Sequence, residues 1–171
     1  MSSVVAADTG PLRYLAEIGH ADLLGQLFDT VLIPPAVFQE LRNPATPAVV
    51  RQWIETKRTW LETRPIRQMQ IIPSLDPGEN EAICLALENN AGAVLLDERR
   101  GRKVARALGL PVAGTLGVLE LAAERGLVEF AVAIERLRRT SIFLAPAIIA
   151  GALERDRVRR EQQPSQESRP D

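Results

Sequence analysis

Two acidic residues each follow a short apolar run, and this spacing could bring their carboxylates together. Asp8 comes after residues 4–7, and Asp97 comes after residues 93–96. Such runs, each followed by a helix-like segment, are typical of buried parallel strands, whose carboxyl ends gather at one edge of a sheet. Two carboxylates at one edge repel each other unless a cation lies between them. The pattern therefore predicts a cation site at this edge.

Two further acids stand where a solvated charge is not expected. Glu81 precedes the run 82–87, which is apolar on every side of a predicted helix and should be buried. Its neighbour Glu79 can complete a capping box with Asp76, whereas Glu81 has no such role, and a buried carboxylate without a partner is costly. Glu40 lies beside the apolar stripe of another predicted helix. Both acids are therefore candidates for the same site.

Each acid also has a structural interpretation. Asp8 could cap the helix that follows it, Asp97 could be a loop charge, Glu81 could favour a helix N-terminus, and Glu40 could be a boundary residue.

Four carboxylates without a histidine or cysteine ligand favour oxygen ligation of Mg²⁺ or Mn²⁺. Such ions polarise phosphate oxygens and generate hydroxide from bound water. The set therefore predicts hydrolysis of phosphodiester bonds.

The counts of histidine and cysteine argue against several other chemistries. The 171 residues include one His and one Cys. Any Ser-His-Asp or Cys-His mechanism would need His20, which stands in a turn that starts a helix. Cys84 lies in an apolar run, so a buried apolar role is expected. An internal disulfide cannot form, and one Cys with one His cannot make a structural zinc site. A phosphatase of the haloacid-dehalogenase type would use Asp8 as nucleophile, but Gly10 stands where that class has a second Asp.

A basic segment directly after Asp97 points to an anionic partner. The net charge is −1, so positive charge for a nucleic acid must be local. Cations at a helix start are mildly unfavourable unless an anion is present, and a phosphate backbone would supply one. A solvated basic face is the alternative. The predicted nucleic-acid-binding residues are Arg99, Arg100, Arg102 and Lys103.

Strands and helices alternate almost throughout, which predicts an α/β layered domain with a mostly parallel sheet. Strands are expected at residues 4–8, 30–33, 60–61, 69–72, 93–97 and 110–113. Helices are expected after residues 9–11, over 21–28 and 36–42, after 47, and over 77–89, 101–108, 116–125, 128–139 and 145–160. We expect one domain over residues 1–161 and a disordered polar tail over 162–171. No apolar run is long enough for a membrane span and no signal peptide is seen, so a cytoplasmic protein is expected.

Four segments together resemble a PIN-domain nuclease, the family of the VapC toxins of bacterial toxin–antitoxin pairs. They are residues 5–12, 33–41, 75–83 and 95–98, and they are most similar to a prokaryotic branch of PIN-like nucleic-acid-binding proteins. The resemblance implies a three-layer α/β/α sandwich and Mg²⁺- or Mn²⁺-dependent cleavage of RNA. It also implies that the metal-binding and catalytic acids are Asp8, Glu40, Glu81 and Asp97, with Glu98 the alternative to Asp97.

The sequence therefore predicts a metal-dependent endoribonuclease that is the toxin of a toxin–antitoxin pair. The expected partners are RNA, a cognate antitoxin protein and a second copy of the chain in a homodimer. No membrane partner is expected. The alternative function is a PIN-like module that has weak or lost catalysis and binds a nucleic acid or a protein.

Overall fold

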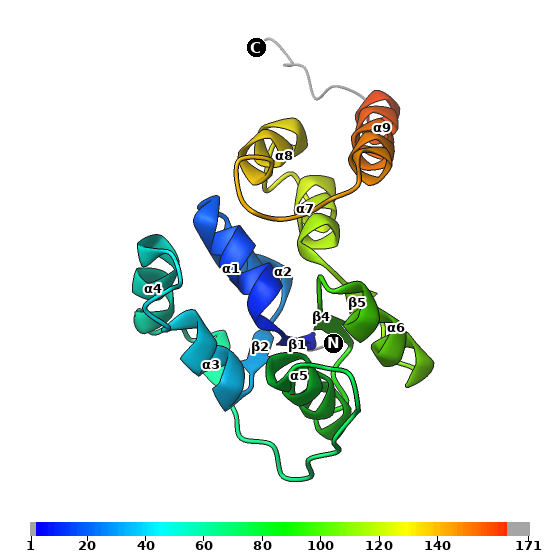
Figure 1. Ribbon diagram of the computed structural model, residues 1–171. Coiled ribbons are helices and arrows are strands. Elements are labelled where there is room, and N and C mark those ends of the chain that lie inside the picture. The colour runs from blue at the N-terminus through cyan, green and yellow to red at the C-terminus, as the bar shows by residue number, and fades with distance from the viewer. Residues whose placement is uncertain (1–2, 164–171) are drawn as a thin grey trace. The chain divides into compact units, whose positions relative to one another are not determined.

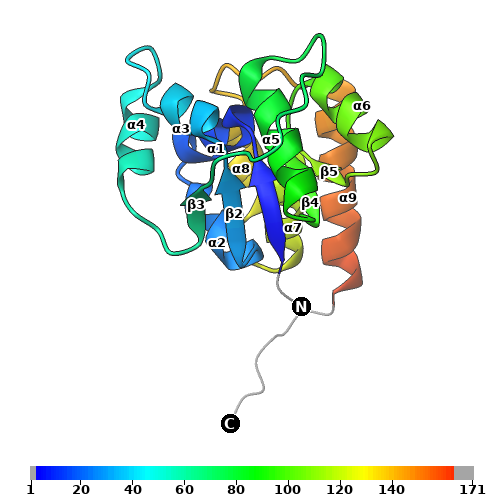
Figure 2. The same ribbon diagram turned by 90° about the horizontal axis from the view of Figure 1, so that it is seen from below.

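Five parallel strands form the sheet that positions the acidic residues. The computed structural model describes residues 3–163. Its strands are β1 Val4–Ala7, β2 Thr30–Ile33, β3 Leu61–Thr63, β4 Ala93–Leu95 and β5 Val112–Ala113. Their order across the sheet is β3-β2-β1-β4-β5, which can be followed in Figure 2. The predicted α/β fold with a mostly parallel sheet is confirmed.

The helices are short, and most begin and end within two residues of their predicted bounds. They are α1 Thr9–Glu17, α2 Leu24–Leu27, α3 Pro35–Leu41, α4 Ala48–Glu55, α5 Pro77–Glu88, α6 Arg99–Ala107, α7 Thr115–Glu124, α8 Phe130–Leu137 and α9 Pro146–Gln162, with a single 3₁₀ turn, η1, at Ala21–Leu23. Figure 1 labels most of these elements. Proline stands in the first turn of α3, α5 and α9, where the missing N–H costs nothing.

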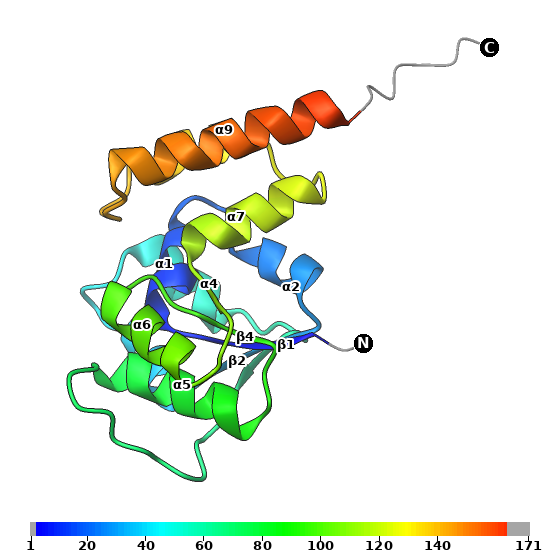
Figure 3. The ribbon, with the colours of Figure 1, turned by 90° about the vertical axis from the view of Figure 1, so that its right-hand side faces the viewer.

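The chain divides into two compact units, residues 1–118 and 119–171. In the first unit, α5 covers one face of the sheet with α6 beside it, and α1 and α2 cover the other face (Figure 3). This is the predicted α/β/α arrangement. The core on the α5 face joins strand and helix residues, among them Ala6, Leu32, Ile83, Val94 and Ala105.

The second unit is helical. It contains the later part of α7 together with α8 and α9, and its core includes Phe130, Ile134 and Ala152. The buried Asp156 of α9 pairs with two arginines of its own helix, Arg159 and Arg160. The single domain predicted over residues 1–161 stays a prediction. Residues 164–171, most of the predicted tail, lie outside the described residues.

One predicted strand is wrong. Residues 69–72 form a loop, because side chains of α5 satisfy the backbone N–H groups of this segment and its neighbours. Ile72 N–H donates to Asn80 Oδ1 at 2.9 Å, and Glu88 accepts from the N–H groups of Arg67 and Gln68. With these donors already bonded, the segment gains less from pairing with a strand.

The strand order creates a topological switch point between β1 and β4. From β1 the chain builds β2 and β3 on one side, and it then returns to build β4 and β5 on the other. Both strands pair directly, with Val5 opposite Ala93. Ligands of open α/β sheets bind at the carboxyl ends of the strands flanking such a point. Asp8 and Asp97 lie at these ends, as their spacing predicted.

Candidate active site

Three carboxylates converge where Gly78 lacks a side chain. The point at which a Cβ would stand on Gly78 is 2.9 Å from Asp8 Oδ1, 3.3 Å from Glu40 Oε2 and 3.5 Å from Asp76 Oδ1. Gly78 lies in the first turn of α5, Asp76 caps that helix, and Asp8 follows β1. The absent side chain therefore lets carboxylate oxygens from three separate parts of the chain gather at Gly78, and we call this cluster of oxygens the acidic hollow.

Local hydrogen bonds fix two of these acids. The Asp8 N–H donates to the carbonyl oxygen of Leu95 at 3.0 Å, which extends the pairing of β1 with β4 by one residue. The hydroxyl of Thr9 donates to Glu40 Oε2 at 2.5 Å. The residue that starts α1 thus turns an acid of α3 toward the end of β1. Asp8 and Glu40, both predicted site residues, are brought together in this way.

The electrostatics of Asp8 are those of a buried acid among like charges. Burial, followed by the negative charges of Asp76, Glu79 and Glu40, raises its pKa to about 8 against the opposing effect of the Thr9 N–H. Only 7% of the Asp8 surface is exposed. A cation in the hollow would reverse this shift, since it would stabilise the ionised form.

Asp97 lies on the same edge but is bound to the start of α7. Its Oδ1 accepts from the Thr115 N–H and its Oδ2 from the Thr115 hydroxyl, both at 2.7 Å. The point where a Cβ would stand on Gly10 is 3.1 Å from Asp97 Oδ2, so this carboxylate packs against the first turn of α1. Burial raises its pKa, while Thr115 and Arg102 lower it. The neighbouring Glu98 is exposed.

Glu81 has a structural partner that its sequence position did not reveal. Its Oε2 accepts a hydrogen bond from the backbone N–H of Ala36, in the first turn of α3, at 3.2 Å. Free N–H groups at a helix start need an acceptor. Glu81 therefore anchors the helix that carries Glu40, one turn along α5 from the hollow at Gly78.

Two acids of the site were predicted only as parts of a capping box. That box is confirmed: Asp76 Oδ1 accepts from Glu79 N–H at 2.8 Å, and Glu79 Oε2 accepts from Asp76 N–H at 3.3 Å. Glu79 is 4% exposed, its Oε1 has no hydrogen-bond partner within residues 3–163, and burial followed by Asp76 raises its pKa. The signal available in the sequence was the glycine after Asp76, since the absence of its side chain lets Asp76 Oδ1 lie near Asp8 and Glu40.

The four predicted nucleic-acid-binding residues differ in their surroundings. Arg99, Arg100 and Lys103 are exposed, although Arg100 Nη1 donates to the carbonyl oxygen of Ser74 at 3.0 Å. Arg102 is half-buried and donates to the carbonyl oxygen of Leu96 at 3.4 Å. Burial lowers the pKa of Arg102, and Asp97 opposes that shift. Arg102 thus balances the charge of Asp97, and the other three leave positive charge at the surface.

A family model described as DUF3368, PIN domain, matches residues 4–157. The chain belongs to the PIN-domain family. PIN domains are generally nucleases, and they typically use divalent metal ions. The acidic hollow at the carboxyl end of β1 is therefore the candidate active site of this PIN domain.

A solved structure has the same fold. It is a PilT N-terminus domain protein from the hyperthermophilic archaeon Sulfolobus solfataricus P2, with a TM-score of 0.51 and 15% sequence identity. The similarity covers 83% of this chain and 99% of the archaeal chain. No curated protein matches the sequence. Within residues 3–163, every helix is too short or too polar to cross a membrane.

The donor atoms suit a hard divalent cation, although they do not form a finished site. Carboxylate oxygens of Asp8, Glu40 and Asp76 approach Gly78 from three segments, and Mg²⁺ would require them at about 2.0–2.1 Å from one point. In the described part of the chain, no three Asp, Glu, His or Cys residues are arranged as a ready metal cluster. All-oxygen ligation and the raised pKa of Asp8 fit a cation that draws these carboxylates inward.

Proposed function

We propose that this PIN domain is a divalent-metal-dependent endoribonuclease whose active-site acids are Asp8, Glu40, Glu81 and Asp97. The observation that carries the proposal is the approach of Asp8 and Glu40 to one point at Gly78, at the switch point of a parallel sheet. Asp76 adds a third oxygen there. Like charges this close are costly unless a cation offsets them, which supports Mg²⁺ or Mn²⁺ as the partner.

Each acid contributes in a different way. Asp8 and Glu40 offer oxygens directly to the hollow, and the Thr9 hydroxyl keeps Glu40 turned toward it. Because its pKa is raised, Asp8 holds a proton in the metal-free protein, and it would release this proton when a cation binds. Asp8 and Glu40 would hold the divalent ion, which would act as a Lewis acid toward phosphate oxygens and lower the pKa of bound water. Glu81 keeps the start of α3 in place and so positions Glu40.

Asp97 lies at the same edge of the sheet, beside the first turn of α1. Its bonds to Thr115 and its packing against Gly10 hold a carboxylate near the end of β1. Because Asp97 is half-buried against α1 whereas Glu98 is exposed at the start of α6, the geometry favours Asp97 as the fourth acid. The exposed Arg99, Arg100 and Lys103 would bind phosphates of an RNA strand passing this edge, while Arg102 balances Asp97.

The biological role that we propose is the toxin of a toxin–antitoxin pair. RNA is the proposed substrate, a cognate antitoxin protein and a second copy of the chain are the proposed partners, and the cytoplasm is the proposed location. The support is the likeness of the four acid-bearing segments to VapC toxins.

A second candidate function is a PIN-like module that binds nucleic acid or protein with weak or no catalysis. The observation that favours it is the engagement of two acids by other donors: Glu81 bonds Ala36 and Asp97 bonds Thr115. A site with two committed acids binds a cation less readily than one with four free acids. Cleavage of RNA by the purified protein distinguishes the two functions.

The deciding experiment is RNA cleavage by purified protein with Mn²⁺, with Mg²⁺ and with EDTA. We expect cleavage with either ion, none in EDTA, and none from Asp8→Asn with either ion. Asp22→Asn is the matched control, since Asp22 is an exposed acid that pairs with Arg58 away from the hollow. Cleavage that persists in EDTA and in Asp8→Asn refutes the metal-dependent mechanism. Metal and RNA binding without cleavage would support the second function.

A further inference from the structure

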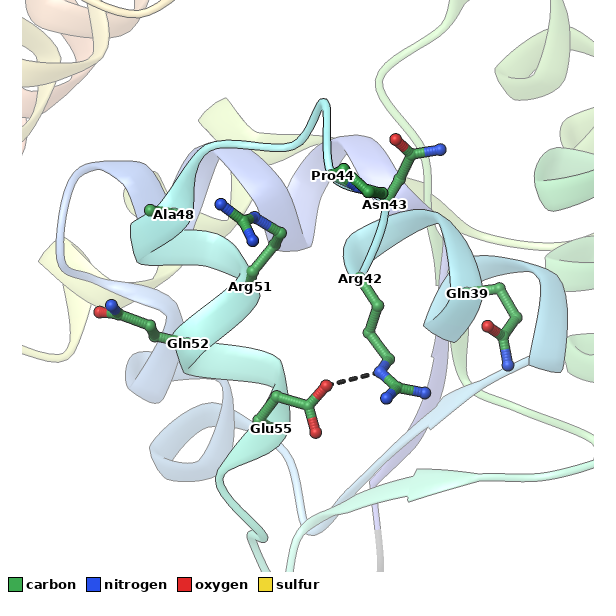
Figure 4. A pocket seen from close by; sticks show the side chains of 8 residues that line it. All are labelled: Gln39, Arg42, Asn43, Pro44, Ala48, Arg51, Gln52 and Glu55. Carbon is green, nitrogen blue, oxygen red and sulfur yellow. Dashed lines mark hydrogen bonds and ion pairs between the residues drawn. The ribbon is translucent and has the colours of Figure 1, made fainter.

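A pocket lined mostly by residues with polar side chains lies between α4 and α3, the helix that carries Glu40. It has a volume of about 820 Å³ and is lined by Gln39, Arg42, Asn43, Pro44, Ala48, Arg51, Gln52 and Glu55. Figure 4 shows Arg42 reaching from the end of α3 to Glu55 of α4, with Arg51 on the α4 wall. Pockets of about 300–1,000 Å³ suit a small ligand or one unit of a polymer.

Hydrogen bonds connect this pocket to the helix that carries Glu40. Arg51 Nε donates to the carbonyl oxygen of Thr46 at 3.0 Å, and the Thr46 hydroxyl donates to the carbonyl oxygen of Glu40 at 2.9 Å. The lining residue Gln39 immediately precedes Glu40 on α3. The pocket is therefore built on the same helix as Glu40 and is linked to its backbone.

The charges of the pocket suit a phosphate. Within residues 3–163, no carboxylate oxygen lies within 4.0 Å of an Arg51 nitrogen, and Arg51 Nε uses only a neutral carbonyl. Arg42 does pair with Glu55 at 2.5 Å, but both side chains are about half exposed. An exposed ion pair contributes little, so a phosphate can replace Glu55 as the partner of Arg42 at small cost. Arginine is the side chain best shaped to bind phosphate oxygens in pairs.

The remaining lining groups suit a nucleobase. The Arg42 guanidinium lies 5.1 Å from the centre of the Phe38 ring, which supports it as a flat surface on which a base can stack. Gln39 of α3 and Gln52 of α4 lie at opposite sides of the pocket in Figure 4, and each amide has a donor and an acceptor for a base edge. Asn43 uses its Oδ1 for the N–H of Ala45 at 2.8 Å, which leaves its amino group as a donor.

We propose that the α3–α4 pocket binds one nucleotide of a single-stranded RNA, with Arg51 on a phosphate and the amides on the base. This assignment rests on the proposed function, because it concerns the strand that the acidic hollow would cleave. It adds a second contact surface, separate from the basic start of α6.

The test measures RNA binding without cleavage. The probe is a fluorescein-labelled single-stranded RNA oligonucleotide of mixed sequence, titrated with the full chain in EDTA and followed by fluorescence anisotropy. We expect Arg51→Ala to raise Kd about fivefold or more and to reduce the slope of log K against log salt by about 0.7, the value for one lost phosphate contact. Arg67→Ala removes an exposed loop arginine outside the pocket and should leave both quantities near those of the wild type.

Base contacts are tested separately. Gln52→Ala should change the relative affinities for uridine, cytidine and adenosine homopolymers without changing the salt slope, since it removes an uncharged group. Thiouridine-containing RNA should crosslink to the peptide covering residues 39–55. Circular dichroism melting of each variant shows whether it is folded.

The outcomes separate this inference from the proposed function. If Arg51→Ala is folded and keeps the wild-type Kd and salt slope, or if the wild type binds no RNA in EDTA, the pocket assignment is overturned. In that case a protein segment becomes the better candidate occupant. If Arg51 is needed for binding but no RNA is cleaved with Mn²⁺ or Mg²⁺, the nuclease proposal fails while the pocket assignment stands.

Discussion

Thr115 donates two hydrogen bonds to Asp97, one from its N–H to Oδ1 and one from its hydroxyl to Oδ2, each at 2.7 Å. Thr115 is fully buried, and Asp97 follows β4 at the edge where Asp8 also lies. The first residue of α7 thus orients an acid that the sequence alone left as a candidate. The two residues are separated by α6 and β5 in the chain and meet only in the folded sheet.

Removal of the Thr115 hydroxyl should therefore weaken both the fold and the site. Thr115→Val keeps the shape of the side chain but leaves Asp97 Oδ2 without its donor, so we expect the free energy of unfolding to fall by about 1–2 kcal/mol. Urea denaturation measures this loss. Thr115→Ser keeps the hydroxyl and should stay close to the wild type. Equal stability of the Val and wild-type proteins would mean that this bond contributes nothing.

The hollow at Gly78 can be filled by one methyl group. In Gly78→Ala the new Cβ would lie 2.9 Å from Asp8 Oδ1 and 3.3 Å from Glu40 Oε2, so one or both carboxylates must move. We expect Mn²⁺ affinity, measured by isothermal titration calorimetry, to fall at least about tenfold, a change of 1.4 kcal/mol.

Gly117→Ala is the matched control for this substitution. Gly117 also lies in a helix, but the nearest atom to its would-be Cβ is the Ala113 Cβ at an ordinary 3.6 Å. Its Mn²⁺ affinity should equal that of the wild type. If Gly78→Ala binds Mn²⁺ equally well, the cation does not use this hollow.

The raised pKa of Asp8 makes the metal-free protein less stable as pH rises. The pKa of Asp8 is about 8 in the folded chain against an ordinary value of 3.8, so between these pH values the folded state holds a proton that the unfolded state has lost. The free energy of unfolding then decreases with pH, by up to about 1.4 kcal/mol per unit, and the loss is complete above about pH 8.

Urea denaturation in EDTA at about pH 5 and about pH 8 checks this dependence. Asp8→Asn removes the titrating group, so its unfolding free energy should fall less between the two pH values. Added Mn²⁺ should restore wild-type stability at the higher pH, because the cation favours the ionised carboxylate. Identical pH dependence of the wild type and Asp8→Asn would contradict the raised pKa.

Glu81 can be tested for its two roles separately. Glu81→Ala removes the acceptor of the Ala36 N–H, so the free energy of unfolding should fall by about 1 kcal/mol, as for the loss of a helix cap. Glu81→Gln keeps an acceptor oxygen and should preserve most of that stability. If Glu81 also contributes its charge to the cation, Gln should still reduce cleavage. Full activity in Glu81→Gln would limit Glu81 to positioning α3.

The sequence by itself determined the α/β fold, the sheet edge where Asp8 and Asp97 lie, and the capping box of Asp76 and Glu79. These features depend on local chemistry: short apolar strands, proline at helix starts, and a capping side chain three residues from its partner. The acids of separate segments could be chosen as candidates in the same way, because each stands at the end of a strand or beside an apolar run.

Only the tertiary structure decided what each acid contacts. Glu81 accepts a hydrogen bond from a backbone N–H 45 residues away, and Asp76 lies with Asp8 and Glu40 at Gly78. Residues 69–72 form a loop where a strand was predicted, and Ile72 N–H donates to Asn80 of α5. The physical reason is that hydrogen-bond partners are set by which segments pack together. The residues adjacent to an acid in the sequence therefore do not indicate which hydrogen-bond donor another helix places beside it.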